Sequence, residues 1–177
     1  MLTGYQVTLR DVVENDLDQL REWRNLPEVR QFMLSDSTID DEQQRAWFKK
    51  VQRDKTQRHF VIEYKGQAIG SANIKSRGNN IPIEQANVIE PGLYIGEAKY
   101  RQNILAFAPT LLLNDYCFNK LGVTKLVAVV KPDNQAALNY NAKLGYKVVN
   151  QGELIDISLN FEDYQLHTQQ LKAFLSR

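Results

Sequence analysis

The chain has 177 residues, of which 43% are hydrophobic and 24% are charged, and its formal net charge is +1. This length and composition suit one globular domain over residues 1–177. The near-neutral charge argues against strong binding to nucleic acids or anionic membranes.

Cysteine and histidine are scarce. Cys117 is the only cysteine, which excludes an internal disulfide framework, and we expect it to be a small buried apolar residue. His59 and His167 stand in no metal-ligand pattern, so no metal site is expected. The N-terminal residues lack the pattern of a signal peptide, and no apolar run approaches the roughly 18 residues of a membrane span. We therefore expect a cytoplasmic protein.

The first third of the chain predicts one strand and three short helices. Residues 5–10 alternate like a strand, and Asn15 can cap a helix that Pro27 interrupts. Residues 28–34 resume a helical pattern, and Asp40 or Asp41 opens a third helix. Apolar residues of the first helix recur every three positions, at Leu17, Leu20 and Trp23.

Strands dominate the middle of the chain. Residues 59–64 and 67–74 flank Lys65-Gly66, which predicts a β-hairpin. Residues 76–83 read as a polar loop. Residues 87–95 are rich in strand formers but contain Pro91-Gly92. Because proline cannot donate to a ladder, this strand needs either a bulge or a free edge there.

Strands and helices alternate through the remaining residues, which favours a mixed α/β domain. Glycines at 122 and 145 are placed to end two helices. The predicted elements are a long helix over 105–121, a buried strand over 125–130, a helix over 134–144, strands over 147–149 and 154–160, and a helix over 162–175.

The segment over 129–146, VVKPDNQAALNYNAKLGY, reads as a strand, a turn, a helix and a glycine stop. It resembles the cofactor-binding end of the GNAT family of N-acetyltransferases. The resemblance implies a twisted mixed sheet that splays between two central parallel strands and is flanked by helices. It also implies transfer of an acetyl group from acetyl-CoA to a primary amine by direct attack in a ternary complex. The matching positions are Val130, Asn134, Ala137, Tyr140, Lys143, Gly145 and Tyr146.

In the GNAT family the cofactor arm binds one strand edge as an added strand. The resemblance places it against the backbone of Leu93, Tyr94 and Ile95, with Asn134 and Ala137 opposite. Asn134 also suits a plain helix N-cap. An alternative is that Pro91-Gly92 merely ends one strand and begins another.

The family's phosphate loop corresponds to Arg101, Gln102, Asn103 and Ala106, whose backbone N–H groups would approach the pyrophosphate. Here Ile104 replaces a glycine of the family pattern. A positive φ at Ile104 would cost on the order of 1 kcal/mol or more. Weaker cofactor binding and a shifted loop register are both open.

Catalysis requires a proton for the leaving thiolate and a base for the amine. The resemblance assigns the first role to Tyr140 and the second to Glu90, acting through water. Tyr140 could instead be a core aromatic residue, and Glu90 a solvated carboxylate. Glu63 is a weaker alternative base.

The acceptor pocket should lie in the N-terminal third, at Arg24, Asn25 and Met33. These residues resemble a subgroup that acetylates nucleotide-linked amino sugars in the pseudaminic acid pathway, and arginine suits phosphate oxygens. Gln44 stands where that subgroup has a histidine. Ribosomal-protein and antibiotic acetyltransferases share a looser version of this region. We expect a small-molecule amine as partner, and a monomer or homodimer. A protein N-terminal acetyltransferase or a non-catalytic binding protein are the alternatives.

Overall fold

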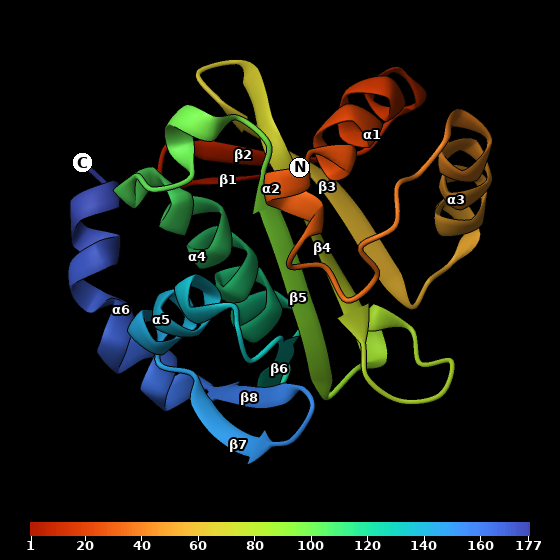
Figure 1. Ribbon diagram of the computed structural model, residues 1–177. Coiled ribbons are helices and arrows are strands. Elements are labelled where there is room, and N and C mark those ends of the chain that lie inside the picture. The colour runs from red at the N-terminus through yellow and green to blue at the C-terminus, as the bar shows by residue number, and fades with distance from the viewer.

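The computed structural model describes residues 1–177 and contains one eight-stranded sheet with helices on both faces (Figure 1). The strand order is β1-β2-β3-β4-β5-β6-β8-β7, and every neighbouring pair is antiparallel except β5 and β6. The expected mixed α/β architecture is therefore confirmed. The strands are β1 (Leu2–Gly4), β2 (Val7–Asp11), β3 (Gln57–Tyr64), β4 (Gln67–Ser76), β5 (Val88–Ile95), β6 (Lys125–Val130), β7 (Lys147–Gln151) and β8 (Ile155–Asn160).

Two helical layers cover the sheet (Figure 1). Alternate residues of β3 face opposite sides, so Phe60 and Ile62 enter the main core with α4 to α6, whereas Val61 packs with α1. The α-helices are α1 (Leu17–Asn25), α2 (Pro27–Arg30), α3 (Asp41–Arg53), α4 (Ala108–Asp115), α5 (Gln135–Leu144) and α6 (Phe161–Leu175), with short helices η1 (Glu14–Asp16), η2 (Ile83–Gln85), η3 (Ala98–Tyr100), η4 (Ile104–Phe107) and η5 (Tyr116–Lys120).

The first predicted strand began too early. Tyr5 and Gln6 have φ values of 50° and 71° and form the turn between β1 and β2. The hairpin at Lys65-Gly66 is confirmed, because both residues have the positive φ of a tight two-residue turn.

The predicted cap of the first helix was wrong, and the predicted second helix is present but shorter than expected. Asn15 does not cap α1, because it lies inside the 3-10 turn η1. The second helix is only Pro27–Arg30, and the chain then enters a loop. Asp40 does cap α3, accepting a hydrogen bond from the Gln43 N–H.

The sheet splays between β5 and β6, as expected. These strands pair only at Val88↔Lys125 and Ile89↔Leu126, and beyond that point each continues with its other neighbour alone. The register between β5 and β4 has no shift across Pro91-Gly92. The structure therefore has the free edge and not the bulge.

The predicted long helix over 105–121 is three consecutive segments. Pro109 has no N–H to donate toward the carbonyl of Leu105, so the chain runs as the 3-10 helix η4 before α4 begins at Ala108. After Asp115 the hydrogen bonding widens to the π-helix η5. Cys117 in η5 is buried, as predicted, and burial raises its pKa to about 12.

No helix is both long enough and apolar enough to cross a lipid bilayer. No three side chains of histidine, cysteine, aspartate or glutamate are grouped so that they could hold a metal ion.

Candidate active-site cleft

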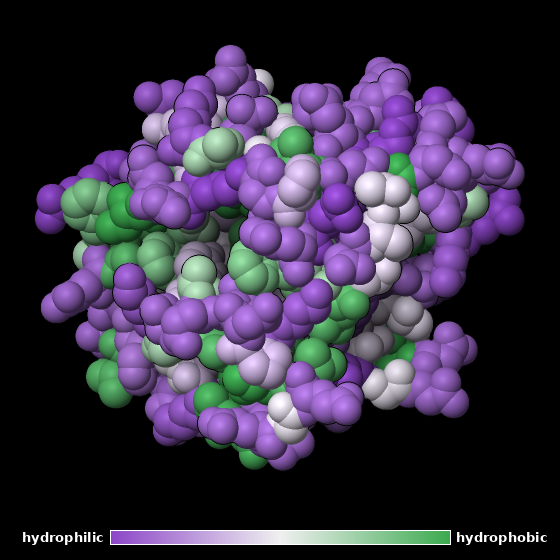
Figure 2. Space-filling view, in the orientation of Figure 1, coloured by the Kyte–Doolittle hydropathy of each residue, from purple (hydrophilic) through white to green (hydrophobic).

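A cleft of about 430 Å³ opens where β5 and β6 part. Its walls come from β5, β6, α4 and α5, and residues of α2 and the loop after it form its rim. Hydrophobic side chains gather between hydrophilic ones on the face that carries α2, α4 and α5 (Figure 2). The lining residues are Glu28, Val29, Phe32, Met33, Pro91, Gly92, Leu93, Tyr94, Ile95, Arg101, Ala106, Thr110, Leu113, Ala128, Val129, Val130, Asn134, Ala136, Ala137, Tyr140, Asn141 and Tyr146.

The edge of β5 that faces the cleft has no neighbouring strand beyond Ile89. In an antiparallel pair, alternate residues turn their N–H and C=O toward the neighbouring strand. Pro91 has no N–H to donate to β4, so it occupies a position whose backbone groups turn away from β4. Leu93 and Ile95 follow Pro91 at alternate positions of the strand, so their N–H and C=O groups also turn away from β4. The Tyr94 carbonyl points the other way, because a Cβ built on Gly70 of β4 would lie 2.3 Å from it. Of the predicted backbone contacts, Leu93 and Ile95 thus lie on the free edge, and Tyr94 lines the cleft with its backbone paired to β4.

Arg101 holds the end of this edge in place. Its Nε donates to the Ile95 carbonyl at 2.8 Å, and its Nη2 donates to the Gly96 carbonyl at 2.7 Å. Its Nη1 lies 3.5 Å from a carboxylate oxygen of Glu28 in α2. The Arg101 side chain therefore joins α2 to β5, whereas the predicted cofactor contact of Arg101 was through its backbone N–H.

The predicted phosphate loop has no left-handed residue at Ile104. The positive φ values of non-glycine residues occur elsewhere, and Ile104 is 42% exposed. The anticipated backbone strain is absent. Asn103 is the N-cap of η4, and its Oδ1 accepts the Leu105 N–H at 3.0 Å. Gln102 and Asn103 are exposed and lie outside the cleft lining, whereas Ala106 lies within it.

On the opposite wall, Asn134 caps α5. Its Oδ1 accepts the Ala137 N–H at 3.1 Å, which confirms the N-cap prediction. Asn134 and Ala137 both line the cleft. Gly145 ends α5 at a φ of 104°, as the glycine stop predicted.

Tyr140 projects from α5 onto the beginning of α4. Its hydroxyl donates to the Ala106 carbonyl at 2.8 Å and lies 2.5 Å from the Thr110 Oγ1. Its ring stacks on Phe107 with centroids 4.4 Å apart. Burial raises the pKa of Tyr140 well above the ordinary tyrosine value. The phenol is therefore protonated at neutral pH, and its proton is directed at the Ala106 carbonyl.

Glu90 lies where β5 leaves β6, but outside the cleft lining. Its carboxylate pairs with the Arg77 guanidinium at 3.2 Å. The alternative base, Glu63, pairs with Arg10 at 2.6 Å and also lies away from the cleft. Neither carboxylate touches the space beside Tyr140, so a base at Glu90 requires an intervening water.

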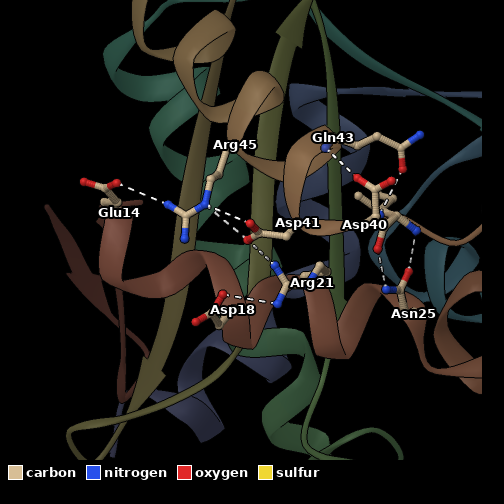
Figure 3. A network of polar contacts seen from close by, with 9 residues as sticks. Glu14, Asp18, Arg21, Asn25, Asp40, Asp41, Gln43 and Arg45 are labelled. Carbon is tan, nitrogen blue, oxygen red and sulfur yellow. Dashed lines mark hydrogen bonds and ion pairs between the residues drawn. The ribbon is translucent and has the colours of Figure 1, made fainter.

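The predicted acceptor residues separate into two groups. Met33 lines the cleft. Asn25 instead exchanges two hydrogen bonds of 2.7 Å with the backbone of Ile39, so its amide secures the loop over 31–40 (Figure 3). Gln44, where the subgroup has histidine, is buried in α3.

Arg24 and Arg30 also hold the loop over 31–40, through hydrogen bonds from their guanidinium groups. Arg24 donates to the Ser35 carbonyl, and Arg30 donates to the Asp36 carbonyl at 2.9 Å. The Nη1 of Arg24 and the Nε of Arg30 are buried without a hydrogen-bond partner. Burial lowers the pKa of Arg24, and the positive charge of Arg30 lowers it further. Two close guanidinium groups with spare donors suit an anion.

Sequence reasoning gave no site role to four polar residues of the cleft, Glu28, Thr110, Asn141 and Tyr146. Thr110 follows Ala106 by one helical turn, a spacing that could have shown that both face Tyr140. Tyr146 was matched only as the aromatic residue after the glycine stop. Its pKa is raised, first by burial and then by surrounding groups that include Glu90.

A second cavity, of about 460 Å³, lies beside α3 and the start of β3. His59 lines it, stacks edge-on against Trp47 at 4.9 Å and donates from Nε2 to the Gln57 Oε1 at 2.7 Å. Burial lowers the pKa of His59 to about 4, so the imidazole is neutral. The cavity carries charges of both signs, of which Arg58 and Asp11 are paired at 2.8 Å, and this mixture indicates no particular ligand.

Comparison with known proteins identifies the class. The acetyltransferase (GNAT) domain family matches residues 6–147, most of the chain. The chain therefore belongs to the GNAT acetyltransferase family. It is an acetyl-CoA-dependent N-acetyltransferase that acts on an amine.

Individual relatives are distant. Acetyltransferase PseH of Campylobacter jejuni is 28% identical over 126 residues, covering 70% of this chain and 71% of that protein. Spermidine N(1)-acetyltransferase of Escherichia coli is 24% identical over 155 residues, covering 88% and 79%. A spermidine N-acetyltransferase from Vibrio cholerae, solved with CoA and spermine, superposes with a TM-score of 0.75 at 18% identity, covering 91% and 99%. This last similarity shows the fold.

Proposed function

We propose that the acceptor is an amine on a phosphate-bearing molecule, with a nucleoside-diphosphate-linked amino sugar as the best candidate. The observation that carries the proposal is the pair of guanidinium groups on Arg24 and Arg30, each with a buried N–H that has no partner. Such donors lose free energy unless an acceptor reaches them, and phosphate oxygens match a planar guanidinium fork. The similarity to PseH is in accord with this class of acceptor.

The site lies beside the cleft. Arg24 is close enough to Tyr94 for its charge to act on the pKa of that hydroxyl, and Tyr94 lines the cleft. Met33 and Phe32 belong to the loop that Arg24 and Arg30 hold, and both line the cleft rim. A phosphate bound by the arginines would place the attached sugar amine between this loop and the β5 edge.

A polyamine acceptor is the rival suggested by the spermidine acetyltransferases. It would need free carboxylates beside the cleft. Glu28 is paired with Arg101, and Glu90 is paired with Arg77. These pairings favour an anionic acceptor over a polycation.

We infer the following roles for the reaction. The thioester supplies the acetyl group. Backbone N–H groups of Leu93 and Ile95 hold the pantetheine arm and polarise the thioester carbonyl. Glu90, through water, accepts the proton that the attacking amine loses. Tyr140 donates its phenolic proton to the sulfur as the C–S bond breaks.

An acceptor panel tests the proposal. Purified protein and acetyl-CoA are mixed with a nucleoside-diphosphate-linked amino sugar, the same sugar without the nucleotide, spermidine, or a peptide with a free α-amine, and CoA release is followed. The nucleotide-linked amine should give the highest kcat/KM. Preference for spermidine, or for the free sugar, would refute the proposal.

Arginine variants test the anion site directly. Arg24→Ala and Arg30→Ala should each raise KM for the nucleotide-linked amine about 10- to 100-fold, because each removes a charge-assisted hydrogen bond. Arg21→Ala is the matched control, since Arg21 lies on α1 but pairs with Asp18 and Asp41 (Figure 3). Equal KM values for Arg24→Ala and Arg21→Ala would contradict the assignment.

A further inference from the structure

Tyr140 is held by three residues of one short stretch of chain. The Ala106 carbonyl, the Phe107 ring and the Thr110 hydroxyl all contact it, and all belong to η4 or the first turn of α4. The Thr110 side chain is buried, with 6% of the residue exposed. Its hydroxyl therefore has a defined position beside the phenol.

The direction of these hydrogen bonds follows from proton counting. Tyr140 has a single phenolic proton, and the Ala106 carbonyl can only accept. The bond from Tyr140 to Ala106 uses that proton. The 2.5 Å contact with Thr110 must then be donated by the threonine to the phenolic oxygen.

We propose that Thr110 is a positioning residue for acid catalysis by Tyr140, and that its hydroxyl stabilises the tyrosinate formed when CoA leaves. The inference rests on the proposed role of Tyr140 and is independent of which amine is acetylated.

The C–S bond of the tetrahedral intermediate breaks, and its electron pair goes to sulfur. The sulfur takes the proton of Tyr140, which turns from the Ala106 carbonyl toward the cleft. The phenolic oxygen becomes negative while the Thr110 proton stays directed at it. Water then returns a proton to the tyrosinate, and the proton lost by the amine passes through water to Glu90.

The charge of the phenolic oxygen explains why threonine matters here. A carbonyl beside a tyrosinate is repulsive, whereas a hydroxyl donor is attractive. The Thr110 bond is the contact that lowers the pKa of Tyr140, against the larger upward effect of burial. Without it, proton donation to sulfur would leave a buried anion with no donor in the protein.

The first test needs no acceptor. 3,5-Difluorotyrosine, a more acidic phenol, is incorporated at position 140 and titrated by fluorine NMR. Thr110→Val preserves the side-chain shape and removes the hydroxyl. It should raise the pKa of the fluorinated phenol by about 1, the effect of losing one hydrogen bond to the charged form. Thr110→Ser should restore the wild-type value. An unchanged pKa in Thr110→Val would overturn the proposal.

The second test is kinetic and uses the amine that the acceptor panel identifies. Thr110→Val should lower kcat roughly 10- to 100-fold, while KM for acetyl-CoA stays within about threefold. Thr110→Ala is the substitute if the valine variant does not fold. A Thr110→Ser variant as slow as Thr110→Val would mean that packing, and not the hydroxyl, matters. If the panel shows no preference for a nucleotide-linked amine, only the acceptor assignment fails, and the phenol titration still decides the role of Thr110.

Discussion

Replacing Tyr140 by phenylalanine separates its catalytic role from its structural one. The change removes the donor to the Ala106 carbonyl at 2.8 Å and the acceptor for Thr110 at 2.5 Å, but keeps the ring stacked on Phe107. Two buried groups lose a partner, which should cost about 1–3 kcal/mol of unfolding free energy. Loss of a general acid should lower kcat about 100-fold, equivalent to about 2.7 kcal/mol of transition-state stabilisation.

The assay follows CoA release at saturating acetyl-CoA and amine, with acetyl-CoA affinity measured separately by calorimetry. Affinity should change by less than about threefold, since the hydroxyl is not needed to hold the pantetheine arm. Tyr164→Phe is the matched control. Tyr164 is fully buried; its hydroxyl donates to Asp115 at 2.6 Å and lies 3.0 Å from the Leu111 carbonyl, away from the cleft. It should lose comparable stability and keep its turnover. A Tyr140→Phe enzyme with wild-type kcat would refute the role of this phenol.

Three further predictions concern stability and the phosphate loop. Burial lowers the pKa of His59 from 6.5 to about 4, so the unfolded chain binds a proton at higher pH than the folded protein does, and the free energy of unfolding should fall by up to about 3 kcal/mol as pH drops from 6.5 toward 4. In denaturant titrations, His59→Asn should flatten this pH dependence. A His59→Asn variant with the wild-type pH profile would contradict the prediction. Ile104→Gly should alter acetyl-CoA affinity by less than about threefold, because Ile104 has neither a positive φ nor a buried side chain. A large gain in acetyl-CoA affinity would contradict this and show that the isoleucine strains the loop. Gly96→Ala would place a Cβ 2.2 Å from the Trp23 indole and should cost about 1–3 kcal/mol. A Cβ at Gly152 would have its nearest contact, the Leu154 carbonyl, at 3.9 Å, so Gly152→Ala should be neutral; equal unfolding midpoints for the two variants would exclude the clash.

Features that depend on neighbouring residues were predictable from the sequence. The hairpin at Lys65-Gly66, the caps at Asp40 and Asn134, and the glycine stop at 145 are each set by a few consecutive residues. The GNAT resemblance added the splay between β5 and β6, which no local pattern encodes.

Features that depend on tertiary pairing were not predictable. Pro91 is compatible with a bulge or a free edge, and only the separation of β6 from β5 decides between them. Asn25 matched an acceptor motif, yet its amide is used by the backbone of Ile39, 14 residues away. Thr110 gained its importance from a contact with Tyr140, 30 residues later. Such contacts require the assembled helices.

The central claim is that the cleft between β5 and β6 binds acetyl-CoA, and calorimetric titration with acetyl-CoA tests it most directly. We expect a Kd near 10 μM, or about −7 kcal/mol. Ala137→Trp, which fills the cleft from α5, should abolish the signal in a folded protein. No binding at millimolar acetyl-CoA, or equal binding by Ala137→Trp, would contradict the assignment of this cleft.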